Sequence, residues 1–549
     1  MKTSVVRLFA GLFVGLLVAE SGRAEEAAVT FSRAVGLLNQ GKPAEARPLL
    51  DETLAGDPNF LPAYRFRGVA RYELRDLAGA VADFTRFLES APDDSYILVR
   101  RGKTFAEMNE PERALDDLNA AVRLQPLYDY AYVGRGEHLS SQGDLDGAVA
   151  DFDRALQLNP RQTAALVGRG HVRFTRGRYV EAIEDLSRAI ESDAADPLKF
   201  LLRSRAKKAA GDLPGAAADC DQALRLRDDF APAFVDRGNL WNDRGNYERA
   251  IADYDRALEL DPTNVNALIN RGGTRRVLKQ FDTALADLDR AVQLAPKSIE
   301  AYRARALVYE DRGEAEAAVA AYDAILAMQP GDVAALVHRA GLHQARNRPT
   351  QAEADYAAAM QLAPRDARLW LYRGGLRIVD ERWNDAEADF SAALKLDPQS
   401  ADAYYNRAFV RLQLDRVDDA IADYDEAVRR KPDDPEFRIN RGMAREAQDD
   451  FAGAEADYDA AVKLDDRLAL AYCNRGHARL RLKRIDDAAA DFEKAIELDA
   501  QMAWAWAGRG LVHQVRKRPG DAERDFAKAR ELDPALDADL QAEIQRLRP

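Results

Sequence analysis

Cysteine is almost absent from this sequence, since Cys220 and Cys473 are the only two among 549 residues. A fold held by disulfides needs more cysteines at shorter spacing, and that class is excluded. The two cysteines lie far apart in the chain. A disulfide requires Cα atoms within about 7 Å, so we expect none between them.

Motifs that would indicate catalysis are also missing. The sequence has no glycine-rich phosphate loop, no serine elbow and no zinc-ligand spacing. Cys473 and His477 are four residues apart and share a helix face, but no third ligand stands at a suitable spacing. We expect no enzymatic activity, no cofactor and no metal.

Positive charge is under-represented, because 79 Lys and Arg stand against 93 Asp and Glu, for a formal net charge of -14. Phosphate backbones attract Lys and Arg, so a nucleic-acid partner is excluded. A protein or peptide partner of basic or neutral character fits this surface better. Nothing in the sequence fixes the oligomeric state.

Long apolar runs are missing except near the N-terminus. Lys2 and Arg7 precede the apolar residues 8–19, which are too few for a comfortable membrane span, and small residues follow at Gly22 and Ala24. This pattern predicts a signal peptide at residues 1–24, cleaved after Ala24. The mature protein would then be periplasmic or secreted, with no integral membrane segment. The alternative is an uncleaved anchor helix.

A repeat of 34 residues occupies nearly all of the remaining chain. Arg recurs at every thirty-fourth position from Arg33 to Arg509, always followed by Gly, Ala or Ser. Ala stands twelve positions after that small residue in all fifteen repeats, and an apolar residue follows four further on. Each repeat holds two amphipathic stretches of about a dozen residues with apolar spacing near 3.6, separated by a polar turn. The pattern predicts fifteen helical hairpins, each with a helix A and a helix B.

These small, Ala, aromatic and Pro positions resemble the tetratricopeptide repeat in order and spacing. Numbered on that pattern, the repeats start at residues 27, 61, 95 and so on to 503, and fill residues 25–536. The resemblance implies an all-α fold, a right-handed superhelical α-solenoid of antiparallel helix hairpins. Residues 537–549 are too short for another repeat. Leu536, Leu540, Ile544 and Leu547 share one helix face, which predicts a C-terminal capping helix.

The Arg before the small residue departs from the family, which commonly has Leu there. Thirteen of the fifteen repeats also have Asp three residues after the helix B Ala. We expect the two to form a structural ion pair inside each hairpin, because a partly buried Arg needs a carboxylate. Examples are Arg203 with Asp219, Arg237 with Asp253, and Arg407 with Asp423.

Members of this family usually bind peptides along the groove lined by the A helices. The sixth position of helix A is Asn270, Asn406, Asn440 or Asn474 in four repeats. An amide can both donate to and accept from a peptide backbone, and the row resembles the asparagine ladder of O-linked N-acetylglucosamine transferases. The alternative is that Asn is simply frequent at this position of the repeat.

Aromatic, Met and His side chains accompany that row at other inward positions of repeats 12–15. They are Tyr405, Phe409, Met443, Cys473, His477 and Trp504. We therefore predict a peptide-binding groove in repeats 12–15 of an extracytoplasmic interaction scaffold. The alternative function is a structural part of a cell-envelope assembly, such as polysaccharide-export machinery.

Overall fold

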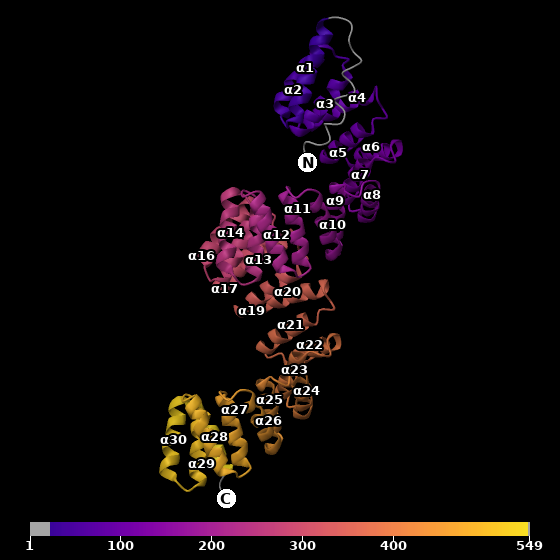
Figure 1. The fold of residues 1–549 in the computed structure, drawn as a ribbon. Coiled ribbons are helices and arrows are strands. Elements are labelled where there is room, and N and C mark those ends of the chain that lie inside the picture. The colour runs from indigo at the N-terminus through magenta and orange to yellow at the C-terminus, as the bar shows by residue number, and fades with distance from the viewer. Residues whose placement is uncertain (1–21, 547–549) are drawn as a thin grey trace. The chain divides into compact units, whose positions relative to one another are not determined.

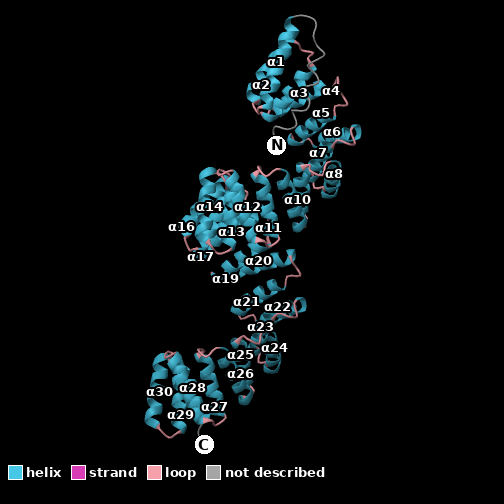
Figure 2. Ribbon diagram, viewed as in Figure 1, coloured by secondary structure: helices cyan, strands magenta, loops and turns pink. Residues whose placement is uncertain are grey.

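The structure is a computed structural model that describes residues 22–546. Thirty-one α-helices and one short 3₁₀ helix, η1 (Pro534–Leu536), make up these residues, and they contain no strand. Figure 2 shows helices joined by short loops throughout. The described residues up to Leu294 form one compact part and those from Ala295 form a second. The all-α repeat solenoid expected from the sequence is confirmed.

Each 34-residue repeat is one hairpin of consecutive helices, and its two helices pack against each other along their length (Figure 1). The A helices are α1 (Gly22–Asn39), α3 (Leu61–Glu73), α5 (Ser95–Glu107), α7 (Asp129–Ser141), α9 (Thr163–Thr175), α11 (Pro197–Ala209), α13 (Ala231–Asp243), α15 (Val265–Val277), α17 (Ile299–Arg312), α19 (Val333–Ala345), α21 (Ala367–Val379), α23 (Ala401–Gln413), α25 (Pro435–Glu446), α27 (Ala469–Arg481) and α29 (Ala503–Val515).

The B helices follow the same period and begin three to five residues after each A helix ends. They are α2 (Pro43–Gly56), α4 (Leu77–Leu88), α6 (Pro111–Leu124), α8 (Leu145–Leu158), α10 (Tyr179–Ser192), α12 (Leu213–Leu226), α14 (Tyr247–Leu260), α16 (Phe281–Leu294), α18 (Ala315–Met328), α20 (Pro349–Leu362), α22 (Trp383–Leu396), α24 (Val417–Arg430), α26 (Phe451–Leu464), α28 (Ile485–Leu498) and α30 (Pro519–Leu532). After η1 the chain ends in α31 (Asp537–Arg546).

Inside the hairpin, the small residue of helix A packs against the aromatic of helix B. A Cβ added to Gly442 would lie 2.6 Å from the ring of Tyr458, so only a very small residue lets the two helices approach this closely. The Ala of helix B is buried in the same contact, as Ala454 is in this hairpin. The small and aromatic residues that recur at these positions therefore form the packing core of every repeat.

The A–B turn needs one residue in the left-handed region, at the fifteenth position of each repeat. Gly313 occupies it with φ +79, while Asp415 adopts φ +59 at the equivalent place. Glycine reaches this conformation without steric cost, which accounts for the glycines that mark many of these turns.

Residues 1–21 lie outside the described residues, and with them most of the predicted signal peptide. The predicted cleavage point after Ala24 falls in the first turn of α1. Among the described residues, no helix has both the length and the apolar character that crossing a membrane requires.

Candidate functional site

The recurring Arg of helix A binds the Asp of its own helix B in all thirteen repeats that have both. Each guanidinium donates from Nε and Nη2 to the two carboxylate oxygens, a bidentate geometry. For Arg407 and Asp423 both distances are 2.8 Å. The predicted pairs of Arg203 with Asp219 and Arg237 with Asp253 have the same form.

The same Arg also reaches back to the preceding hairpin, a contact that the sequence analysis missed. Its Nη1 donates to the side chain sixteen residues earlier in eleven repeats. These acceptors are Asp51, Thr85, Asn119, Asp153, Ser187, Asp221, Asp255, Asp323, Ser391, Asp425 and Asp459. The Arg therefore joins consecutive hairpins and uses its donors inside the structure, which leaves it unsuited to ligand binding.

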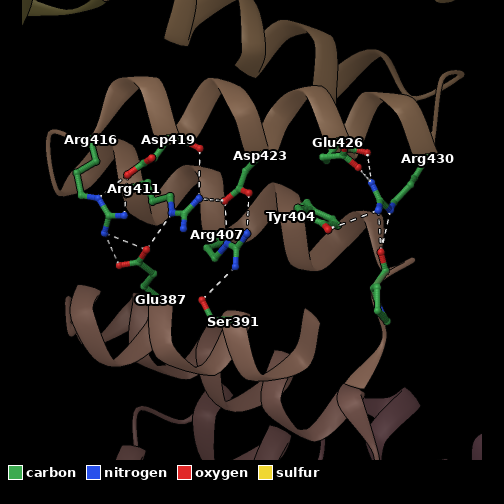
Figure 3. Close-up of polar contacts among 11 residues, drawn as sticks. Glu387, Ser391, Tyr404, Arg407, Arg411, Arg416, Asp419, Asp423, Glu426 and Arg430 are labelled. Atoms are coloured by element: carbon green, nitrogen blue, oxygen red, sulfur yellow. Dashed lines mark hydrogen bonds and ion pairs between the residues drawn. The ribbon is translucent and has the colours of Figure 1, made fainter. Parts of the chain in front are cut away.

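A second cation completes this network in many repeats, and Figure 3 shows it around Asp423. Arg411, one turn after Arg407, donates from Nη1 to Asp423 at 2.6 Å and from Nε to Glu387 of α22 at 2.9 Å. Glu387 also accepts from Arg416 in the following turn, at 2.8 Å. Three helices, α22, α23 and α24, are thus held by one buried ion network.

The remaining variable surface is the A face, which we define as positions 2, 5, 6, 9 and 12 of the A helices. Consecutive A helices contact one another directly, as α25 does α27 and α27 does α29. Each of the last three repeats has an exposed apolar side chain on this face. Met443 on α25 is 47% exposed, Leu470 on α27 is 48% exposed and Trp504 on α29 is 39% exposed. Exposed apolar side chains on consecutive helices are typical of protein contact surfaces.

The predicted asparagine row lies at the seam between consecutive A helices. The Asn440 amide donates to the hydroxyl of Tyr405 at 3.1 Å and to the Glu436 carbonyl oxygen of its own helix. Asn406 donates to the Asp402 carbonyl oxygen in the same way. Their side chains are half-buried. Some of the amide N–H groups of these asparagines therefore already donate hydrogen bonds within the fold.

The other two asparagines of the row differ from this pattern. Asn270, in the first half of the chain, donates to the Asn239 side chain at 2.8 Å. The Nδ2 atom of Asn474 is buried and has no hydrogen-bond partner among the described residues. The four asparagines thus have different local environments.

Aromatic side chains next to the row pack across neighbouring repeats. The Tyr405 ring stacks on Phe437 with centroids 4.7 Å apart, and its hydroxyl donates to Glu436 at 2.8 Å. Phe409 packs edge-on against Trp383 of the preceding repeat. These two aromatics are half-buried and mainly support the face.

Of the two predicted inward residues of α27, Cys473 is buried and His477 is half-buried. Cys473 is 1% exposed, and burial raises the pKa of its thiol to about 12. The His477 ring lies edge-on to Phe492 and Trp504, and its Nε2 has no partner within residues 22–546. Burial lowers the pKa of His477 to about 4. Among the described residues, no group of three potential metal ligands includes this pair.

The half-buried carboxyl of Glu446 has a shift in the opposite direction. Glu446, at the end of α25, has its pKa raised to about 7, mainly by burial. The charges of Arg481 and Glu543 act on both groups. A neutral His and a protonated Glu are favoured in this part of the fold.

This pair of shifts gives a pH dependence with a defined sign. The folded pKa of His477 is lowered, so its contribution to stability is lost as the pH falls from about 6.5 to about 4. The folded pKa of Glu446 is raised, so its contribution is lost as the pH rises from about 4.5 to about 7. The two trends oppose each other in the wild-type chain.

Single substitutions should separate the two trends. Chemical denaturation between pH 4.5 and 7.5 should show Glu446→Gln losing stability toward acid, and His477→Gln losing it toward neutral pH. Each change should be on the order of 2 kcal/mol over the range. Two flat profiles would contradict these shifts.

The comparisons with known proteins agree with the repeat. A tetratricopeptide-repeat family model matches residues 31–95, 99–162, 138–197, 275–333, 339–401, 377–435 and 410–469. The chain belongs to the tetratricopeptide-repeat family. Further models described as TPR repeat and tetratricopeptide repeat match residues 238–274 and 469–501. No curated protein matches this TPR chain.

Solved TPR structures resemble the chain at low identity. Cut9 in the APC/C hetero-tetramer Cut9–Hcn1 is 16% identical with a TM-score of 0.44, covering 89% of this chain and 97% of the other. Yeast Tom70 is 18% identical with a TM-score of 0.37, covering 82% and 99%. A tetratricopeptide repeat protein from Parabacteroides merdae is 22% identical with a TM-score of 0.35, covering 46% and 98%. A TPR scaffold of this kind is suited to binding protein partners.

Proposed function

We propose that this protein is an extracytoplasmic scaffold that binds segments of other proteins on the A face of repeats 12–15. The observation that supports it most is the set of exposed apolar side chains on α25, α27 and α29, namely Met443, Leu470 and Trp504. Their neighbours Asn406 and Asn440 supply polar groups at the same seam. Apolar anchors beside amides can hold a peptide without a demand for one sequence.

The structural arginines support this assignment by exclusion. Their guanidinium groups are engaged with Asp partners in repeat after repeat, so the cations most abundant in the pattern are not available to a ligand. The A face is a surface whose side chains differ from one repeat to the next. Selectivity must come from these varying side chains, because a contact repeated in every hairpin cannot distinguish one ligand from another.

The N-terminal pattern supports the extracytoplasmic part of the proposal. If residues 1–24 are a cleaved signal peptide, N-terminal sequencing of the exported protein should begin at Glu25. A mature chain that begins at Met1 and remains with the cytoplasmic fraction would contradict this part alone.

Peptides selected from a displayed library against the full chain would test the groove. We expect the triple variant Asn406→Ala, Asn440→Ala and Asn474→Ala to bind them at least tenfold more weakly, as measured by fluorescence anisotropy. It should unfold within about 1 kcal/mol of the wild type, because the amides of Asn406 and Asn440 make intrahelical bonds that water replaces easily.

A matched control places three alanines on the exposed surface of the B helices. Asp418, Arg429 and Lys463 are exposed residues of α24 and α26. Their alanine variant should bind the selected peptides as the wild type does. Equal losses in both triple variants would remove the A face as the binding surface.

A further inference from the structure

The C-terminal helix α31 is amphipathic and buries its apolar side. Leu540 and Ile544 are one turn apart and are 0% and 9% exposed, while Gln541 and Gln545 on the other side are exposed. Both apolar residues belong to one packed cluster with Cys473, Leu480 and Leu511 of the A helices α27 and α29. Helix α31 thus packs into the last two repeats through two side chains.

The burial of the A face shows where α31 lies. The twelfth position of helix A is half-buried or exposed in every repeat except the fourteenth, where Leu480 is 3% exposed. At the ninth position Leu511 is 1% exposed, whereas Met443 in repeat 13 is 47% exposed. Both unusual residues share the cluster of Leu540 and Ile544. Helix α31 therefore covers a part of the A face that most other repeats leave open.

Charged groups extend this contact beyond the last hairpin. Arg481 Nη1, at the end of α27, lies 3.8 Å from Glu543 Oε2 of α31. A helix that only closed the end of the stack would contact α29 and α30. The ion pair with Arg481, together with Leu480 in the shared cluster, places α31 against α27 as well.

We propose that α31 is a tethered ligand of the A face, and that partner proteins displace it with a helix of the same chemistry. The partner segment would be an amphipathic helix with two apolar residues one turn apart and an acidic residue placed to meet Arg481. This inference rests on the proposed function and specifies its partner.

The small contact made by α31 is what makes such displacement feasible. Helix α31 meets α27 and α29 through Leu540, Ile544 and one ion pair of 3.8 Å, and a second ion pair joins its Asp537 to Arg530 of α30 at 3.1 Å. Two aliphatic side chains are a small apolar contact for a whole helix. The short tether through η1 compensates, because it gives an effective concentration on the order of millimolar. A free partner with a longer apolar face can outcompete such a contact.

A cysteine at position 480 would report whether α31 covers the face. In the full chain we expect Leu480→Cys to react with a maleimide slowly, and adding Ile544→Asp to raise its rate at least tenfold. Leu412→Cys, at the same position of repeat 12 and half-buried, should react at the same rate with or without Ile544→Asp. Gln545→Asp, on the exposed side of α31, is the matched control and should leave Leu480→Cys slow.

Cys220 controls for folding in this experiment, which uses a Cys473→Ala background because Cys473 shares the cluster of Leu540 and Ile544. Cys220 is buried in the B helix of repeat 6 and should stay unreactive in every variant. If Cys220 is unreactive and Leu480→Cys still reacts at one rate in all variants, α31 does not cover the A face and the proposal is wrong.

A labelled peptide of residues 534–549 would test displacement. It should bind the full chain with Ile544→Asp at least tenfold more tightly than the wild-type chain, and a peptide that itself has Ile544→Asp should bind neither. Equal affinity of the peptide for the two chains would overturn the tethered-ligand proposal. So would a lack of binding to the Ile544→Asp chain in which Leu480→Cys has become reactive.

Failure of the proposed function gives a different pattern, in which this peptide binds as expected but the binding of selected peptides does not depend on the A face.

Discussion

Asp423→Ala should destabilise repeats 11 and 12 by about 3–5 kcal/mol. Asp423 is 4% exposed, and its carboxylate accepts hydrogen bonds from both Arg407 and Arg411. Its removal leaves the largely buried Arg407 without a carboxylate and takes one of two carboxylates from Arg411, and an uncompensated buried charge is costly. Hydrogen exchange of peptides from α22, α23 and α24 would locate the loss, and denaturation would measure it.

Two comparisons separate the ion network from a general effect of mutation. Asp433→Ala removes an exposed carboxylate from the loop after α24 and should change stability by no more than about 0.5 kcal/mol. Replacing Arg407 and Asp423 together, with Arg407→Leu and Asp423→Leu, should cost less than Asp423→Ala alone, because Arg407 is then not left buried without a carboxylate, while Arg411 keeps Glu387. A double variant less stable than the single variant would contradict this account of the network.

Phe492→Ala should destabilise repeats 14 and 15 by about 3–5 kcal/mol, because it removes a fully buried ring. The ring fits between two glycines, since an added Cβ would lie 2.9 Å from it at Gly476 and 2.2 Å at Gly508. Gly508→Ala alone should therefore also destabilise this region, through a clash with an immobile ring.

A double variant tests this fit directly. Combining Gly508→Ala with Phe492→Leu should be less destabilised than the sum of the two changes, because the smaller side chain makes room for the new methyl group. Glu493→Ala, next in sequence and exposed, should be nearly neutral. Strictly additive losses in thermal denaturation would show that the ring and the glycine do not share the same space.

The repeating part of this fold is predictable because the residues that make its contacts recur at the same position of successive 34-residue repeats. The Arg and Asp columns have the same 34-residue period, so pairing them requires only that helix A and helix B lie side by side. The backward contact of Arg407 to Ser391 could have been found from the same kind of column, since most repeats have a polar residue there. Its acceptors vary among Asp, Asn, Ser and Thr, which obscured the pattern.

The features that occur only once in the chain have no period from which they could be predicted. The sixth position of helix A is predicted to face a ligand, and the structure adds that Asn440 donates to Tyr405 of the preceding repeat, at the seam between helices. A shift of a fraction of a helical turn separates these two orientations, and the apolar pattern does not resolve it. Helix α31 was expected as a cap from the spacing of Leu540 and Ile544. Its contact with Arg481 depends on a single copy of each residue and has no period to indicate it.

Site-specific photocrosslinking tests most directly whether the A face is the binding surface. A photoreactive residue would replace Met443 on the A face or, in a separate chain, Arg429 on the exposed surface of α24. A peptide selected on the wild-type chain should crosslink to position 443, and an excess of the unlabelled peptide should abolish the product. Crosslinking at position 429 with none at position 443, under the same competition, would contradict the account.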